Sequence, residues 1–180
     1  MKGVGTIDGI FVLRQTMGKC REKQKVLHMA FIDLEKAHDR VPREEVWRSL
    51  RGRGAPEKYV KIIQESDRNA TTKVRSTVGT THSFQVKVGL HQGSALSPFL
   101  FNTAFDVLTE AVRENPPWCV LYADDVLVAT SKRALQTKLE RWRQALENRG
   151  MKISRSKTEY ITTNGEGDQQ DTIQLDGVNR

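Results

Sequence analysis

Apolar residues recur along this chain at two different spacings. Runs with a helical period, several of them opened by a proline at a first helical position, predict helices. The predicted helices cover residues 7–24, 42–50, 56–64, 98–112 and 135–146. Shorter runs that are continuously apolar, or that alternate with polar residues, predict strands. The predicted strands cover residues 26–32, 72–78, 83–88, 120–122, 126–128, 152–153 and 159–162.

Two pairs of these strands are predicted to be hairpins. Residues 79–82, which begin with a glycine, would turn the first hairpin. Residues 123–125 would turn the second, with two aspartates at its tip. The polar residues 164–180 are predicted to form a loose tail.

The charge of the chain favours a polyanionic partner. The net charge is +7 at pH 7, and the sequence pI is about 9.6. Basic side chains that neutralise phosphates release condensed counterions, which drives binding. Residues 131–160 hold nine Lys or Arg against three Glu, so this segment is the first candidate contact surface. A solvated helix face would carry the same charge, and this alternative stays open.

Composition also bears on the compartment. No apolar run approaches the roughly 20 residues that span a bilayer, and the first residues lack the basic-then-apolar order of a secretory signal. We therefore expect an intracellular protein, in the cytoplasm or the nucleus, with no membrane partner. The two cysteines, Cys20 and Cys119, form no zinc or disulfide pattern and are expected to be reduced thiols.

Three aspartates adjoin short apolar runs, where an ionised side chain is costly unless it is solvated or holds a cation. Asp33 directly follows the first predicted strand, and Asp124 and Asp125 lie between two others. If these strands are neighbours in one sheet, the carboxylates converge on a site that suits Mg²⁺. Two such ions about 4 Å apart support in-line nucleotidyl transfer. Taken singly, Asp33 could instead cap a helix, and the Asp124–Asp125 pair could form a turn.

Four segments resemble, in order, the motifs of reverse transcriptases from retrotransposons without long terminal repeats (non-LTR). Phe31–Pro42 (FIDLEKAHDRVP) is similar to the first catalytic motif, and Gly89–Pro98 (GLHQGSALSP) to the second. Tyr122–Asp125 (YADD) resembles the Tyr-X-Asp-Asp box, and Gly150–Glu159 (GMKISRSKTE) the motif that follows it. One short box is a weak signal, whereas four motifs in family order are specific.

This resemblance implies a polymerase palm, an α+β fold in which helices back an antiparallel sheet, with incomplete fingers and thumb. Residues 26–163 would be the palm, residues 1–25 a connecting helix from the fingers, and residues 164–180 a polar tail where the thumb starts. The chain would be an RNA-directed DNA polymerase fragment. It would add deoxynucleotides, supplied as triphosphates, to the 3′-hydroxyl of a DNA primer on an RNA template.

The resemblance also assigns the metal site. Asp33, Asp124 and Asp125 would hold two Mg²⁺ ions. Because side chains alternate between the faces of a strand, Asp124 is expected to be the principal ligand beside Asp33, and Asp125 a secondary one.

The remaining site residues implied by the resemblance contact the nucleotide. Gln92 and Gly93 would line the nucleotide pocket, and Lys157 would approach the triphosphate. His38 stands where the family usually has Tyr or Phe beneath the incoming sugar. Imidazole is smaller and offers a hydrogen-bonding nitrogen, so discrimination against ribose is expected to be relaxed.

Two other functions stay open at this point. The chain could be an inactive retrotransposon remnant that at most binds nucleic acid through residues 132–157, or a related palm polymerase that uses ribonucleotides. Metal-dependent primer extension separates the first alternative, and comparison of ribo- with deoxynucleotides separates the second. The sequence leaves the oligomeric state undetermined.

Overall fold

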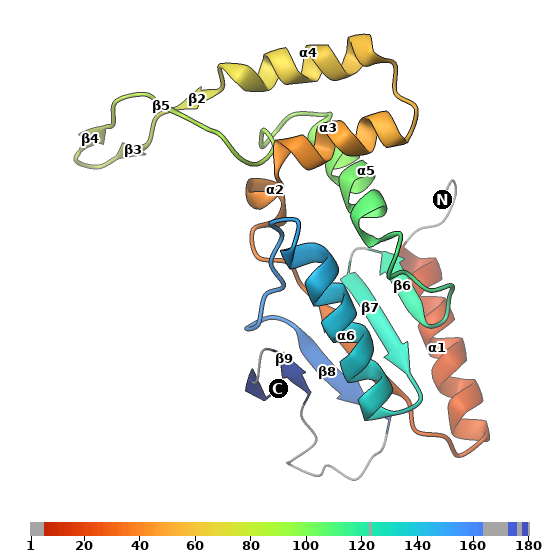
Figure 1. The fold of residues 1–180 in the computed structure, drawn as a ribbon. Helices are drawn as coiled ribbons and strands as arrows, with labels where there is room; N and C mark the ends of the chain where they lie inside the picture. The colour runs from red at the N-terminus through yellow and green to blue at the C-terminus, as the bar shows by residue number, and fades with distance from the viewer. Residues whose placement is uncertain (1–5, 123, 164–172, 176–177, 180) are drawn as a thin grey trace. The chain divides into compact units, whose positions relative to one another are not determined.

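The computed structural model describes residues 6–122, 124–163, 173–175 and 178–179. Its contacts divide the chain into two compact units (Figure 1). The sheet unit comprises Met1–Glu35, Ala111–Asn148 and Lys152–Arg180. The helical unit comprises Lys36–Glu110 and Arg149–Met151.

Four antiparallel strands form the centre of the sheet unit. In spatial order they are β6 (Cys119–Tyr122), β7 (Asp124–Ala129), β1 (His28–Ile32) and β8 (Glu159–Thr162). β1 is an inner strand because β7 pairs along one of its edges and β8 along the other. Its residue His28 lies opposite Ala129 on one side and Thr162 on the other.

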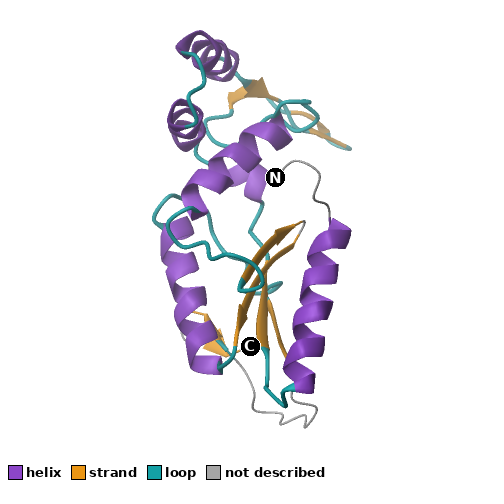
Figure 2. Cartoon of the chain, turned by 90° about the vertical axis from the view of Figure 1, so that its right-hand side faces the viewer, coloured by secondary structure: helices purple, strands orange, loops and turns teal. Residues whose placement is uncertain are grey.

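Two helices cover this sheet, one on each face (Figure 2). In α1 (Thr6–Glu22), Val12, Leu13 and Cys20 pack against a buried cluster of strand residues. That cluster contains Leu27, Met29, Val120, Val126 and Val128. α6 (Lys132–Glu147) packs against β7 and β1. The predicted antiparallel sheet backed by helices is therefore confirmed.

The α6 helix shows why its sequence forms a helix at this place. The side chain of Ser131 accepts a hydrogen bond from the backbone N–H of Ala134, which caps the first turn. Apolar residues then recur at helical spacing and are completely or almost completely buried. They are Leu135, Leu139, Trp142 and Leu146.

Four helices build the helical unit. They are α2 (Ala37–Arg40), α3 (Arg43–Gly52), α4 (Glu57–Arg68) and α5 (Ser97–Thr109). α3 packs against both α4 and α5. Pro42 and Pro56 directly precede α3 and α4, and Pro98 lies in the first turn of α5, as the sequence predicted.

The segment Thr71–Gln85, which we call the arm, differs from the predicted hairpin. Only two-residue ladders form: β2 (Thr71–Thr72) pairs with β5 (Phe84–Gln85), and β3 (Arg75–Ser76) pairs with β4 (Gly79–Thr80). The turn lies at residues 77–78, so the prediction of a turn at residues 79–82 is wrong. The Ser76 hydroxyl accepts from Val78 N at 3.4 Å and donates to Gly79 O at 3.2 Å, which fixes the earlier turn.

The second predicted hairpin is confirmed, but its acids are not in the turn. Tyr122 pairs directly with Asp124, and Leu121 pairs with Asp125. Both aspartates therefore belong to β7, because this strand continues its pairing with β6 and β1 up to its first residues. Residue 123, which joins the strands, lies outside the described residues.

The C-terminal predictions have mixed outcomes. The strand over residues 159–162 is confirmed, whereas Ile153 makes only an isolated bridge with Leu34. The prediction of a loose tail is wrong for its described part. Ile173 is 2% exposed, and β9 (Gln174–Leu175) pairs with β10 (Val178–Asn179).

Among the described helices, none is long and apolar enough to cross a membrane. Both cysteines are free thiols, and Cys119 is buried. Burial raises the pKa of the Cys119 thiol to about 11, so this group stays protonated at neutral pH.

The buried stripe of α6 is expected to dominate the stability of the sheet unit. Leu139 is 0% exposed, and replacing it by alanine leaves a cavity, so Leu139→Ala should lower the free energy of unfolding by about 2–5 kcal/mol. The exposed Arg141 lies on the same helix, and Arg141→Ala should change it by less than about 0.5 kcal/mol. Urea unfolding followed by circular dichroism measures both. Equal effects of the two substitutions would contradict the observed packing of α6.

Candidate active site

The acidic residues lie at one end of the paired strands β1 and β7. Ile32, the last residue of β1, lies opposite Asp125, and Asp33 follows directly. β7 begins with Asp124. The side chain of Asp124 lies outside the described part of the structure, so the predicted approach of its carboxylate to Asp33 remains a prediction.

The segment after α6 holds the backbone of Asp33 in place. Asp33 O accepts a hydrogen bond from Ser154 N at 2.7 Å, and Asp33 N donates to the Thr158 hydroxyl at 3.5 Å. Both Ser154 and Thr158 are buried. One residue further on, Glu35 N donates to Lys152 O at 2.9 Å. These contacts tie the segment resembling the fourth motif to Asp33 and Glu35.

The same segment brings Lys157 to Asp33. Lys157 Nζ lies 3.8 Å from Asp33 Oδ2, and the two side chains are 74% and 44% exposed. An exposed ion pair of this kind contributes at most about 1 kcal/mol to stability. The carboxylate of Asp33 therefore remains accessible to another cation.

In the helical unit, His38 and Gln92 both adjoin Asp39, the first in sequence and the second through a hydrogen bond. The His38 ring stacks on Phe101, with ring centroids 4.4 Å apart. The next residue, Asp39, accepts a hydrogen bond from Gln92 Nε2 at 2.6 Å. Gly93 follows with a positive φ of 82° and an exposed surface. The predicted nucleotide-contacting residues 38, 92 and 93 thus belong to one unit, whereas Asp33 and Lys157 belong to the other.

A close backbone contact joins the first and second motifs within the helical unit. Leu90 N donates to His38 O at 2.8 Å, and Gly89 N donates to Val41 O at 3.0 Å. Gly89 has a φ of +83°, and a Cβ atom there would lie 2.4 Å from Asp39 O. Only glycine fits this position without strain, because both the backbone conformation and the space exclude a side chain.

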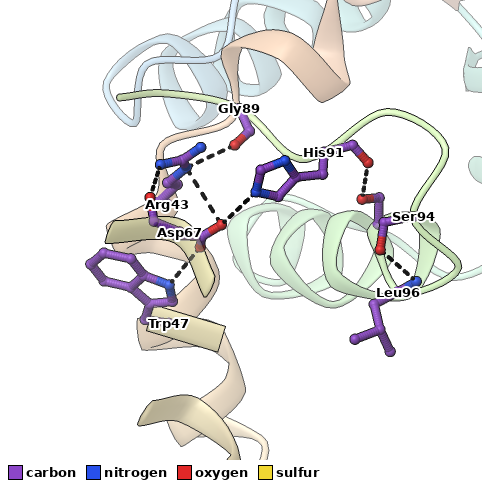
Figure 3. A network of polar contacts seen from close by, with 8 residues as sticks. Arg43, Trp47, Asp67, Gly89, His91, Ser94 and Leu96 are labelled. Atoms are coloured by element: carbon purple, nitrogen blue, oxygen red, sulfur yellow. Dashed lines mark hydrogen bonds and ion pairs between the residues drawn. The ribbon is translucent and has the colours of Figure 1, made fainter. Parts of the chain in front are cut away.

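A buried arginine fastens this contact to the helices (Figure 3). Arg43 donates to Gly89 O at 3.0 Å and to Asp67 O at 2.8 Å, and its Nε lies 3.7 Å from Asp67 Oδ1. The side chains of Arg43 and Asp67 are each 7% exposed. The same carboxylate accepts from Trp47 Nε1 at 3.4 Å and lies 3.6 Å from His91 Nε2. This network positions the loop residues Gly89 and His91, which lead into Gln92.

A pocket of about 450 Å³ opens beside this network in the helical unit. The lining combines the indole of Trp47 with the basic side chains of Arg68 and Lys87. Other lining residues are Pro42, Arg43, Glu44, Gln64, Asp67, Gln85, Val86 and Val88.

Several basic side chains of the segment 131–160 are paired with acidic residues of the same chain, so they are less available to an external anion than the composition indicates. Lys138 pairs with Glu114 at 2.7 Å, and Arg149 pairs with Glu45 at 2.7 Å. Arg143 bonds both Glu140 and Glu147, and its hydrogen bonds lower the pKa of Glu140 to about 2. Lys138, Arg143 and Arg149 are thus engaged in close internal ion pairs, and Arg155 and Lys157 lie 3.9 Å and 3.8 Å from carboxylate oxygens of Glu147 and Asp33.

Sequence reasoning missed the residues that support the site. Phe101 stood in a predicted helix with nothing to distinguish it from core, and Asp67 had no local sign of a buried partner. Asp39 lies inside the first motif, but nothing in the sequence around it indicates that its carboxylate accepts a hydrogen bond from Gln92. The glycine at position 89 was the one available signal, because a glycine opening a motif often marks a close backbone approach.

Among the described side chains, no group of three or more His, Cys, Asp or Glu is arranged to hold a metal ion. The side chain of Asp124 is not among these described side chains.

An antiparallel sheet with helices on both faces, and acids where β1 ends and β7 begins, is the architecture of a palm-type polymerase domain. The family described as "Reverse transcriptase (RNA-dependent DNA polymerase)" matches residues 2–179, and the chain belongs to this family. Reverse transcriptases generally use divalent metal ions.

Relatives among retrotransposon proteins confirm the resemblance to the non-LTR group. One is the Pol polyprotein of the type-1 retrotransposable element R2 from Nasonia vitripennis, 27% identical over 83% of this chain. The R2 polyprotein of Popillia japonica is 29% identical over 92% of this chain. The chain spans only 15% and 26% of the lengths of these two relatives.

Solved structures confirm the fold. Telomerase from Candida tropicalis in complex with a fragment of telomeric RNA matches 98% of this chain and 32% of its own, with a TM-score of 0.70 and 16% identity. The apo form of this telomerase matches 97% of this chain and 35% of its own, with a TM-score of 0.69 and 17% identity. At these identities the likeness concerns the fold alone.

The Gly89 contact can be tested by adding one carbon atom. Gly89→Ala should lower the free energy of unfolding by about 2–4 kcal/mol, because strain at positive φ adds to a clash with the backbone of Asp39. Gly54 has a similar φ of +77° with nothing within 4 Å, so Gly54→Ala carries the strain without the clash and should cost about 1 kcal/mol. Thermal and urea unfolding of both variants measure the difference. If Gly89→Ala costs no more than Gly54→Ala, the close approach is absent.

Proposed function

We propose that this chain is the palm segment of an RNA-directed DNA polymerase of the non-LTR retrotransposon type. It would extend a DNA primer on an RNA template with deoxynucleoside triphosphates. The observation that carries the proposal is that an aspartate follows β1 at the end where the neighbouring strand β7 begins with two more. Acids at one end of two central strands are costly unless they serve a cation.

The antiparallel register supports a shared metal site. Ile32 lies opposite Asp125 in the last pair of the register, and residues 33 and 124 are the next positions beyond that pair. Carboxylate oxygens are the ligands that Mg²⁺ prefers. Asp33 and Asp124 would hold the ions, with Asp125 secondary. When bound, two Mg²⁺ ions activate the primer hydroxyl and stabilise the leaving pyrophosphate.

The chain's own residues would contact the substrates, some from each of the two units. Lys157, whose side chain is 74% exposed beside Asp33, would neutralise charge on the triphosphate. Gln92 would contact the incoming nucleotide with its amide oriented by Asp39, and the lack of a side chain at Gly93 would let a base approach the backbone. His38, stacked on Phe101, would lie beneath the sugar.

The proposed domain limits follow from these roles. Residues 26–163 would form the palm, residues 1–25 the helix that connects it to the fingers, and residues 164–180 a polar segment leading to the thumb. An RNA template, a DNA primer and deoxynucleotides would be the partners.

The metal site can be tested without relying on catalysis. Fe²⁺ added in place of Mg²⁺, with ascorbate and peroxide, cuts a polypeptide beside the bound ion. Cleavage is expected near residues 33 and 124, and Asp33→Asn with Asp124→Asn should abolish it because two ligand charges are lost. Glu110→Gln removes an exposed acid of the helical unit and should leave the pattern unchanged. Cleavage that is unaffected by the double substitution would overturn the assignment.

Primer extension tests the activity itself. The chain should extend an RNA-templated DNA primer only with a divalent metal, and Asp124→Asn should reduce the rate by about a hundredfold or more, since even indirect metal supports contribute ten- to a hundredfold. Metal-dependent cleavage without any extension would favour the inactive remnant. Preference for ribonucleotides would favour the related palm polymerase.

His38 is expected to weaken selection against ribose. His38→Tyr should raise the ratio of deoxy- to ribonucleotide incorporation by about tenfold to a hundredfold, because a larger ring stacked on Phe101 blocks a 2′-hydroxyl better. His38→Phe controls for the phenolic hydroxyl. The ratio is measured after the chain replaces the matching segment of the Popillia japonica R2 polyprotein. Identical ratios for all three proteins would remove His38 from sugar selection.

A further inference from the structure

The arm is a prominent feature of the helical unit that no motif explains. Every residue from Thr71 to Gln85 is exposed, and Val78 at its turn is 95% exposed. In Figure 1 the arm extends away from α4 as a narrow loop. Its ladders are two residues long and have no hydrophobic face against a core. An isolated two-stranded ladder of this size is marginal in water, so packing within the chain does not account for it.

The charge of the arm is strongly one-sided. No Asp or Glu occurs between Arg68 and Asp106. Within this stretch the arm carries Lys73 and Arg75 on its outgoing limb, and Lys87 follows its return limb. A segment without acids repels other cations and attracts anions along its whole length.

Within the part of the chain that the structure describes, these basic side chains have no ion-pair partner, unlike several in the segment 131–160. Among the described residues, no acid lies within ion-pair distance of Lys73, Arg75 or Lys87. Lys138 and Arg143, by contrast, are each held by glutamates. A cation that has no internal partner can neutralise an external anion without first breaking a contact.

Hydroxyl groups give the arm a second means of contacting phosphates. Ser and Thr side chains, together with backbone N–H groups, supply many of the hydrogen bonds that proteins make to phosphate oxygens. The arm holds seven of them, at positions 71, 72, 76, 77, 80, 81 and 83. Protein interfaces, in contrast, have a buried aromatic or apolar centre, and the exposed apolar side chains here, Val74, Val78 and Phe84, are spread singly along the arm.

We infer that the arm is a nucleic-acid-binding element that contacts the sugar-phosphate backbone through Lys73 and Arg75, together with Lys87, which follows it in the chain. The inference rests on the proposed function in so far as the polyanion is the template or its hybrid with the primer. The base of the arm leads directly to Gly89, which is fixed against Asp39 beside Gln92. Backbone contacts made by the arm would thereby set the register of the strand relative to the nucleotide pocket.

The test compares two double substitutions of equal charge in the same unit. Lys73→Gln with Arg75→Gln removes the outer cations of the arm, and Lys58→Gln with Lys61→Gln removes two exposed cations from α4. Binding of a labelled single-stranded RNA and of an RNA–DNA hybrid of equal length is measured by fluorescence anisotropy at several salt concentrations. The arm variant should lower the slope of log affinity against log salt by about 1.4 for the single strand and about 1.8 for the hybrid. The α4 variant should leave both slopes unchanged.

Each outcome has a distinct meaning. A slope change with both nucleic acids in the arm variant alone is the expected result and supports the inference. A change only with single-stranded RNA would assign the arm to the template, and a change only with the hybrid would assign it to the duplex; both also support the inference. Equal changes in the two variants would show that net charge alone is responsible and would overturn it, while leaving the proposed polymerase intact. Binding of the arm to vesicles of anionic lipid with no change in RNA affinity would also overturn it. If the unsubstituted chain binds neither nucleic acid, both the inference about the arm and the proposed function are contradicted. The iron cleavage pattern then shows separately whether the metal site is present.

Discussion

The inner position of β1 is the constraint on which the sheet unit depends. This strand pairs with β7 on one side and β8 on the other, so its register fixes both neighbours. Met29 and Ala30 are buried at its centre, and the strand ends where the chain changes from apolar residues to Asp33. Because helices cover both faces of the sheet, a shift of one residue would exchange the side chains that α1 and α6 contact and would move Asp33 along the sheet. The stability of the sheet and the location of Asp33 therefore have the same cause.

A close approach of two backbone segments plays the corresponding part in the helical unit. Gly89 lies against Asp39, and Arg43 holds the glycine's carbonyl while its charge is matched by Asp67. Removing the carboxylate of such a buried pair is strongly destabilising, because it leaves the arginine charge buried without its partner. The residues next to this contact, His38 and Gln92, are those whose orientation matters for a nucleotide.

The distribution of charge divides the basic residues into two groups. Several in α6 and after it stabilise the fold through pairs with glutamates, as for Lys138 and Arg149. Those of the arm have no such partner among the described residues. Net charge alone pointed to the C-terminal segment, because composition counts cations and does not record which acids lie beside them. A polyanion is expected to bind where basic side chains have no acidic partner within the chain, because no internal ion pair has to be broken there.

The sequence by itself determined the five longer helices, the strands on either side of the acids and the family, because helical and alternating periods and motif order are local properties of the chain. It did not predict the short helix α2. Only the tertiary structure decided that Asp124 and Asp125 begin a strand instead of forming a turn, since strand pairing with β1 and β6 outweighs the turn preference of aspartate. It also decided that Ile173 is buried and that Asp67 neutralises Arg43 across 24 positions. Such contacts join residues distant in sequence, and no local pattern records which distant side chain will complete a buried charge or cover an apolar one.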